Sequence, residues 1–426
     1  MFFALLRAGL WEREVALLPY VQGGAPAVQK PQASAEQHVV AWQKPQAPGE
    51  QHPPTEQKPQ APAEQHTLAG QADLPGRPSA QPGSLDTGAV YRIADEQAVV
   101  GLVAAGLDHV EDRAMSKAEV LSFLKKAVSL EGRNRSMNEF VASLMRRLEA
   151  EGIRALLVKG QGIGQCYERP LWRSAGDVDL LLDAENYARA KAFLPTIATK
   201  VEKEEVSKKH FAMHFGNWEV ELHGTLHNVF SQRSNDLFDG ILDEMFRRES
   251  FRIWDNNGTD IPLPPADEDV IIIFSHIIQH FFSGGIGLRQ LCDWCRLLHT
   301  FRDSLDRDLL KDRISTMGLM AEWKAFAAYA VDYLGITPDD MPMYDPSRRW
   351  SRKARRINRY ILYKGNFGHN IDRSYYHKYP FLVRKAISLW INTREFIAHL
   401  PIFPADATRI FFHRLIYGFS VAAHGE

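Results

Sequence analysis

The sequence has few of the features that mark secreted, membrane-spanning or polyanion-binding proteins. Three cysteines, Cys166, Cys292 and Cys295, are an odd number in 426 residues and do not make a disulfide framework. The formal net charge of −1 gives no overall field for nucleic acid or an acidic membrane. The longest apolar run, residues 270–282, is interrupted by histidine and glutamine and is too short to span a bilayer. With no convincing export signal, we expect a cytoplasmic protein without a membrane partner.

Large apolar residues are nearly absent between residues 25 and 85, where Gln, Pro, Ala, Glu and His dominate. Related units recur at a fixed interval there, namely QKPQASAEQH, QKPQAPGEQH and QKPQAPAEQH. Stacking such units would bury almost no apolar surface, which argues against a solenoid. We predict a disordered repeat linker over residues 21–86. The apolar start, residues 1–20, predicts a helix that packs on the main body.

The most informative stretch, residues 153–183, holds two short apolar runs joined by a glycine-bearing connection. Asp177 and Asp179 open the second run, and residues two apart on a strand project from one face. Neighbouring carboxylates repel unless a cation lies between them, and hard cations such as Mg²⁺ take oxygen ligands of this kind. Lys159 and Arg173 suit phosphate oxygens. Taken alone, an Asp-x-Asp also fits a turn before a strand.

Residues 209–224 predict a β-hairpin that turns at Gly216-Asn217. One of its faces is apolar and would pack in the core. The opposite face would carry His210, His214, Glu219, Glu221 and His223. Alternation alone leaves this polar face open to either bulk water or a site cleft. It also leaves Glu219 and Glu221 equivalent, because both have the same parity.

A Lys-Gly after one strand, an arginine before GDVDLL, and an acidic-x-His motif on a later strand together resemble a known pattern. They are similar to the nucleotidyltransferase superfamily with the DNA polymerase β-like fold. The closer resemblance is to a bacterial group of nucleotidyltransferase family proteins in which Lys-Gly replaces the usual Gly-Ser. The resemblance extends to MFFALLRAGLW, YRIADEQAVVGLVAAGL and HIIQH…GGIGLRQLCDW.

The resemblance implies an α+β fold with a mixed sheet flanked by helices. The nucleotidyltransferase domain would cover residues 87–264, and an all-helical C-terminal domain would cover residues 265–426. The implied activity moves an NMP group from an NTP to an acceptor hydroxyl on a small molecule, a protein or tRNA. A non-catalytic nucleotide- or metal-binding module of the same fold, acting through a protein partner, is the alternative, because the serine of the usual signature is missing.

The resemblance also assigns roles to individual residues. Asp177, Asp179 and Glu221 would hold one or two Mg²⁺ ions, or Mn²⁺. The nucleotide would be bound by Lys159, Gly160, Arg173 and Gly176. Without metal such a cluster would be strained by like-charge repulsion, so divalent cations should raise thermal stability. By the same reasoning Asp179→Asn should leave the metal-free protein at least as stable.

Further polar residues are candidates for the acceptor side of the site, namely His223, His276, His280, Arg289 and Asp293. His276 and His280 lie one turn apart on a helix that we expect Asp267 to cap. Ile277 stands where a zinc-protease motif needs glutamate, so histidines hydrogen-bonded within a helical layer are the alternative. Arg289 and Asp293, at i and i+4, also fit an ordinary surface salt pair.

Helices are also predicted over residues 94–107, 116–130 and 137–150 from the spacing of apolar positions. Residues 348–359 contain seven basic side chains and no acidic one. RNA binding is the less favoured interpretation of this run, since the rest of the chain is not basic. A solvated helix face explains the same density of charge.

Overall fold

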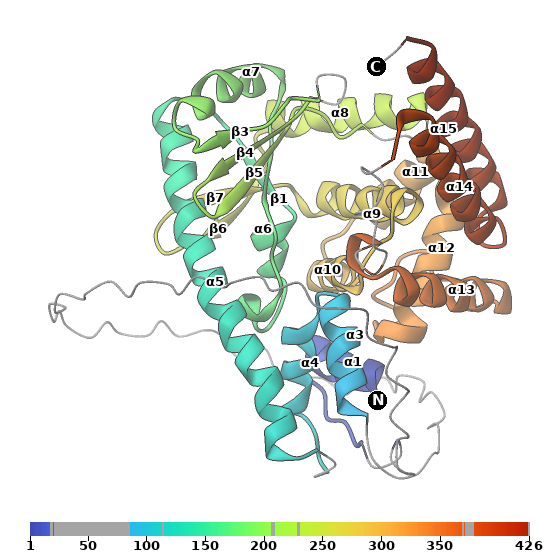
Figure 1. The fold of residues 1–426 in the computed structure, drawn as a ribbon. Helices are drawn as coiled ribbons and strands as arrows, with labels where there is room; N and C mark the ends of the chain where they lie inside the picture. The colour runs from blue at the N-terminus through green and yellow to red at the C-terminus, as the bar shows by residue number, and fades with distance from the viewer. Residues whose placement is uncertain are drawn as a thin grey trace, which may run out of the picture.

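The structure, a computed structural model, describes residues 1–17, 20, 86–112, 115–205, 209–227, 231–368, 370 and 379–424. Apart from residue 86, the predicted repeat linker lies outside these ranges. The architecture is α+β, as predicted, with a mixed sheet flanked by helices and a helical C-terminal region (Figure 1).

The sheet that organises the molecule has five strands in the order β1-β2-β5-β4-β3. Its strands are β1 (Leu156–Val158), β2 (Val178–Leu181), β3 (Lys200–Val201), β4 (His210–Phe215) and β5 (Trp218–His223). The predicted hairpin is confirmed, since β4 and β5 pair antiparallel and Gly216, with φ +62°, occupies the turn. β5 then pairs in parallel with β2, which puts Asp179 directly opposite Glu221. The crossover between these strands contains α7 (Ala184–Phe193), whose N-cap is Asp183.

Hydrophobic alternation explains which face of the sheet is buried. Val178 and Leu180 of β2 and Val220 and Leu222 of β5 are all buried in one apolar layer. The long helix α5 (Lys117–Ala150) covers this layer with residues such as Met137, Val141 and Leu144. The intervening residues of β2 and β5 therefore point to the opposite face.

The structure corrects the predicted helix boundaries on either side of residue 110. One helix was expected over residues 94–107, but there are two, α3 (Thr87–Glu96) and α4 (Val100–Leu107), separated at Ala98, which has φ +55°. Conversely, the two helices expected over residues 116–150 form the single helix α5. The polar middle of α5 is tolerated because one of its residues, Asn134, is buried and donates to the carbonyls of Leu171 and Arg173.

The N-terminal helix α1 (Phe2–Trp11) packs against α4. The backbones approach closely at Gly9, where an added Cβ would lie 1.8 Å from the carbonyl oxygen of Leu102. Trp11 also donates its indole N–H to the carbonyl of Leu334 over 2.6 Å. Residues more than three hundred positions apart are thereby held in contact.

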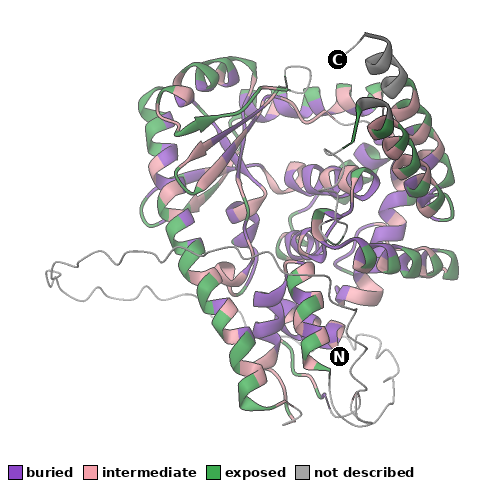
Figure 2. Ribbon diagram, viewed as in Figure 1, coloured by how far each residue is buried: buried purple, intermediate pink, exposed green. Residues whose placement is uncertain are grey.

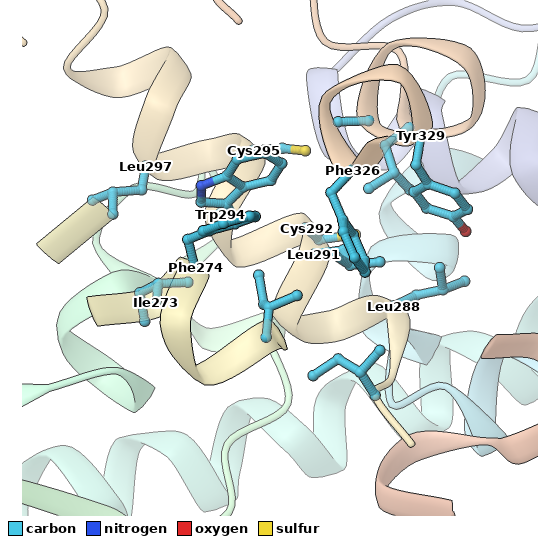
Figure 3. Packing of buried hydrophobic residues seen from close by; sticks show 14 of the residues in the cluster. Ile273, Phe274, Leu288, Leu291, Cys292, Trp294, Cys295, Leu297, Phe326 and Tyr329 are labelled. Carbon is cyan, nitrogen blue, oxygen red and sulfur yellow. The ribbon is translucent and has the colours of Figure 1, made fainter. Parts of the chain in front are cut away.

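The helical region begins with α8 (Gln232–Arg248) and the two-stranded sheet of β6 (Arg252–Asp255) and β7 (Asp260–Leu263). It continues with α9 (Ala266–Ser283), α10 (Leu288–Thr300), α11 (Arg307–Met317), α12 (Met320–Tyr329), α13 (Arg348–Lys364), α14 (Phe381–His399) and α15 (Pro404–His424). α9 and α10 are largely buried (Figure 2). Phe274 of α9 packs against Trp294 and Phe326 (Figure 3). No helix in the described residues has the length and apolarity to cross a membrane.

Two details of the helical region bear on the predictions. Asp267 does not cap α9, whose N-cap is Pro265. The carboxylate of Asp267 instead accepts a hydrogen bond from the backbone N–H of Asp306 over 2.9 Å. The basic run of residues 348–359 lies on α13, with its arginines on the exposed face. Trp350 and Ile357 of the same helix are buried, so the run is one face of an amphipathic helix.

Candidate active site

The turn after β1 positions the first charged side chain of the site. Lys159 follows Val158 and has φ +56° and ψ −146°, a conformation that residues other than glycine rarely adopt. Gly160, with φ +40°, follows and begins the short helix α6 (Gly160–Gly164). This backbone places the Lys159 ammonium 2.8 Å from Oδ1 of Asp179. The strained conformation is thus located at a charged site.

Three carboxylates converge at the polar face of β2 and β5. Asp179 lies opposite Glu221 in the parallel register, and Asp177 immediately precedes β2. Each of the three side chains offers an oxygen, and these oxygens lie within 4.8 Å of one another. Asp179 is buried, whereas Asp177 and Glu221 are half-buried. Glu219 instead faces Glu202 and His214 near the sheet edge.

The protein environment shifts the pKa values of these three carboxylates in different directions. The charge of Asp179, followed by burial and the charge of Glu221, raises the pKa of Asp177 to about 6. Burial opposes ionisation of Asp179, but Lys159 and His223 outweigh it and lower its pKa. Burial likewise opposes ionisation of Glu221, but hydrogen bonds from His210 and His223 lower its pKa. Asp177 is therefore the carboxylate whose negative charge is least compensated by the protein.

Two histidines bridge this carboxylate group on its β4 side. His223 Nε2 lies 2.8 Å from Asp179 Oδ1 and 3.5 Å from Glu221 Oε2. His210, directly opposite His223 in the β4–β5 register, places its Nε2 3.0 Å from the same oxygen of Glu221. The sequence placed His210 on the polar face of the hairpin but did not identify it as a site residue. Its parity with Glu221 was the available signal.

Arg173 forms a buried ion pair that the sequence did not reveal. Its guanidinium donates to both carboxylate oxygens of Asp293, over 2.9 Å and 2.6 Å, and to the carbonyl of Ser174. Tyr167 donates to the same carboxylate over 2.8 Å. The alternative of a surface salt pair between Arg289 and Asp293 is therefore wrong, because Asp293 is buried and engaged by Arg173.

Residues 83–335 match a family model described as an uncharacterised nucleotidyltransferase. The chain belongs to this family of nucleotidyltransferases. Neither a curated protein nor a solved structure matches the chain. The matched residues contain the whole five-stranded sheet and continue through α9, α10 and α12. The family match therefore joins the carboxylate-bearing strands to the helices that face them.

In this nucleotidyltransferase the carboxylates open into a cavity of about 140 Å³. Lys159, Gly160, Arg173, Gly176 and the three carboxylates line it from the sheet side. The helical wall is formed by Ile273, His276, His280, Arg289, Gln290, Asp293 and Phe367. Phe367 comes from beyond α13, and no feature of its surrounding sequence, GNFGHN, indicates a role in the site. The structure thus brings every residue predicted for the site to this cavity except His223, which contacts Asp179 but does not line the cavity.

The helical wall is chemically distinct from the sheet side. The rings of His276 and His280 are 4.2 Å apart, and burial lowers the pKa of both, that of His280 to about 4. Both imidazoles are therefore neutral at pH 7. Burial and the charge of Arg173 lower the pKa of Arg289, which donates to the carbonyl of Ser174 over 3.1 Å. Among the described residues, its buried Nε has no hydrogen-bond partner.

The carboxylate group fits a hard divalent cation. Its ligand atoms are oxygens, their separation allows one ion to contact all three, and Asp177 carries charge that the protein leaves poorly compensated. Lys159 already lies on one oxygen of Asp179, which lessens the repulsion within the group. These residues could hold Mg²⁺ or Mn²⁺.

Proposed function

We propose that this protein transfers an NMP group from an NTP to an acceptor hydroxyl. The hydroxyl oxygen would bond to the α-phosphorus, the bond from that phosphorus to the bridging oxygen would break, and pyrophosphate would leave. The observation that supports this proposal is the register of β2 and β5. It sets Asp179 opposite Glu221, and Asp177 lies close to both at the cavity. A scaffold has no physical need for three converging carboxylates, since their repulsion is unfavourable.

Asp177, Asp179 and Glu221 are the proposed ligands of the cation. Divalent metal bound there would supply charge neutralisation to the triphosphate. Lys159 and Arg289 would contact phosphate oxygens from opposite walls of the cavity. Arg289 suits this role because its buried Nε is unpartnered among the described residues, and an anion would satisfy it.

Arg173 receives a different role from the one suggested by its sequence position. Its guanidinium is engaged by Asp293 and Ser174, so it is a positioning residue. It ties the segment before β2, which carries Gly176 and Asp177, to α10. Arg133 supports the same segment by donating to the carbonyl of Gly176 over 3.1 Å. Together these bonds fix where β2 begins.

The acceptor would approach from the helical wall. His276 and His280 line the cavity, and their lowered pKa makes both weak bases, so an imidazole would accept a hydrogen bond from the hydroxyl and orient it without taking its proton. The proton would pass from the acceptor oxygen to a carboxylate oxygen of the group as the new bond to phosphorus forms. Phe367 would limit the space beside His280, whose ring lies 4.9 Å from it.

The test incubates the full chain with each α-³²P-labelled NTP, Mg²⁺ and fractionated cell extract, and follows label into small molecules, protein and RNA. Label in one fraction with the wild type, and none with Asp177→Asn, supports transfer and identifies the acceptor class. NTP binding without transfer in any fraction would favour the non-catalytic binding module. Absence of both NTP binding and transfer would refute the proposed function.

A further inference from the structure

A second group of metal-ligating side chains lies beside the carboxylates, on the same face of the sheet. His210 of β4 and His223 of β5 are direct cross-strand partners, and Glu221 lies two residues before His223. Their ligand atoms all lie within 4.8 Å of one another. Glu221 lines the cavity, but neither histidine is among its lining residues. The two imidazoles therefore meet Glu221 from the side away from the proposed nucleotide.

The spacing of these atoms suits a small transition ion. Two ligands that are each about 2.05 Å from a tetrahedral ion lie about 3.3 Å apart. Both imidazole Nε2 atoms approach Glu221 Oε2, at 3.0 Å for His210 and 3.5 Å for His223. Asp179 Oδ1 lies 2.8 Å from His223 Nε2 but is engaged by the Lys159 ammonium, so water would supply the fourth ligand. No side chain would need to change strand or face to surround an ion.

We propose that His210, His223 and Glu221 form a second cation site, which takes Zn²⁺ or another first-row transition ion. Two imidazoles and one carboxylate are typical ligands of such ions, whereas Mg²⁺ prefers an all-oxygen set. Sharing of Glu221 with the hard-cation set rests on the proposed function, but binding of the transition ion does not. Glu221 would then connect a structural or tuning ion to the ion that contacts the triphosphate.

A neighbouring group provides an internal comparison on the same sheet face. Glu202, His214 and Glu219 also place their ligand atoms within 4.8 Å of one another. This group contains one imidazole, and Glu202 is exposed and also accepts from Lys200 over 3.0 Å. It is therefore less suited to a transition ion. His214→Ala is the matched control for His210→Ala, since both histidines lie on β4 and face the same way.

The test titrates Co²⁺ and Zn²⁺ into the full chain with millimolar Mg²⁺ present. Visible absorption reports imidazole ligation of Co²⁺, and competition with a chromophoric chelator gives the Zn²⁺ affinity. We expect one tight ion per chain in the wild type, in His214→Ala and in Asp177→Asn. His210→Ala and, separately, His223→Gln should weaken binding by more than about tenfold, the smallest loss usual for metal-site partners. Thermal melts show whether each histidine variant folds. If one of them does not fold, the metal affinity of the other tests the proposal.

Three results would overturn this inference. They are absence of stoichiometric Co²⁺ absorption, unchanged affinity in both histidine variants, and loss of affinity in His214→Ala alone. Failure of the proposed function is distinguishable from these results. A Co²⁺ spectrum that depends on His210, without labelled-nucleotide transfer, would refute the transferase while leaving the second site intact. Nucleotide transfer without stoichiometric Co²⁺ binding would support the transferase and refute the second cation site.

Discussion

The ammonium of Lys159 lies 2.8 Å from a carboxylate oxygen of Asp179, and the lysine holds this position with φ +56°. Such a backbone conformation costs about 1–3 kcal/mol in residues other than glycine. The ion pair and the strain can be separated by two substitutions that both remove the ammonium.

Lys159→Gly and Lys159→Ala should both lose the ion pair, but only glycine accommodates the backbone without strain. We expect the glycine variant to have the larger free energy of unfolding, by about 1 kcal/mol. Urea denaturation without divalent cations measures this difference. Equal stability of the two variants would show that the turn relaxes when the lysine is removed.

The raised pKa of Asp177 predicts a pH-dependent difference between the wild type and Asp177→Asn. Folding raises this pKa from 3.8 to about 6, so the native state favours the protonated acid. The protonated form supports stability at low pH, and that support is lost as pH rises through about 6. Without divalent cations, the asparagine variant should be more stable above pH 6, by on the order of 2–3 kcal/mol, and similar to the wild type near pH 4. Parallel denaturation curves from pH 4 to 8 test this prediction.

Divalent cations should stabilise the wild type by linkage, by about 2.7 kcal/mol at a hundred times the dissociation constant. Asp177→Asn and Glu221→Gln should each remove most of this increase and lower transfer at least about 100-fold, since several kcal/mol of charge stabilisation are lost. Glu219→Gln is the matched control, because it lies on β5 with the same parity but belongs to the group near the sheet edge. Thermal melts with and without Mg²⁺ measure the effect. An equal loss in Glu219→Gln would contradict the assignment.

Substitutions of the two arginines of the cavity should have different effects, one on NTP binding and the other on the stability of the fold. Arg289→Ala should weaken NTP binding by about 1–3 kcal/mol with little change in stability. Arg173→Ala should instead destabilise the fold by about 3–5 kcal/mol, because it leaves Asp293 buried and unpaired. The double variant Arg173→Leu with Asp293→Leu should recover much of that loss. Calorimetric NTP titration and urea denaturation measure the two effects. A stable Arg173→Ala that no longer binds NTP would restore Arg173 as a phosphate ligand.

Close packing of α1 on α4 makes Gly9 sensitive to a single methyl group. Gly9→Ala should destabilise the protein by at least about 1–3 kcal/mol, since the added Cβ would lie 1.8 Å from the carbonyl oxygen of Leu102 and the helices must separate. Gly132→Ala, on α5, is the control because nothing lies near its added Cβ. It should be neutral or slightly stabilising. Melting temperatures of the two variants test the prediction.

Parity predicted that Glu219 or Glu221 would share a face with Asp177 and Asp179, and the resemblance to nucleotidyltransferases favoured Glu221. The parallel register of β2 and β5 places Glu221 directly opposite Asp179. The sequence also predicted the hairpin turn at Gly216-Asn217. It could not reveal the Arg173–Asp293 pair, whose members are 120 residues apart and come from different layers. Without that pair, Arg173 looked like a phosphate ligand and Asp293 like the partner of Arg289.

Helix boundaries predicted from local sequence were also wrong where a polar residue is buried. The middle of α5 resembles a break between helices until Asn134 is seen to satisfy two carbonyls of the segment that leads to β2. From the sequence, Asp179→Asn was expected to leave the metal-free protein at least as stable as the wild type. The structure shifts that expectation to Asp177, because Asp179 is ion-paired with Lys159 and bonded to His223.

The register between β2 and β5 has a consequence for how the site can change over evolutionary time. A slip of one residue would turn Val220 and Leu222 out of the apolar layer and drive Glu221 into it. The alignment of the carboxylates is therefore enforced by the hydrophobic side chains behind them, independently of any bound ion. Substitutions among the polar residues can therefore change the chemistry of this face without unfolding the sheet. The same fold can in this way acquire new chemistry while its geometry is inherited unchanged.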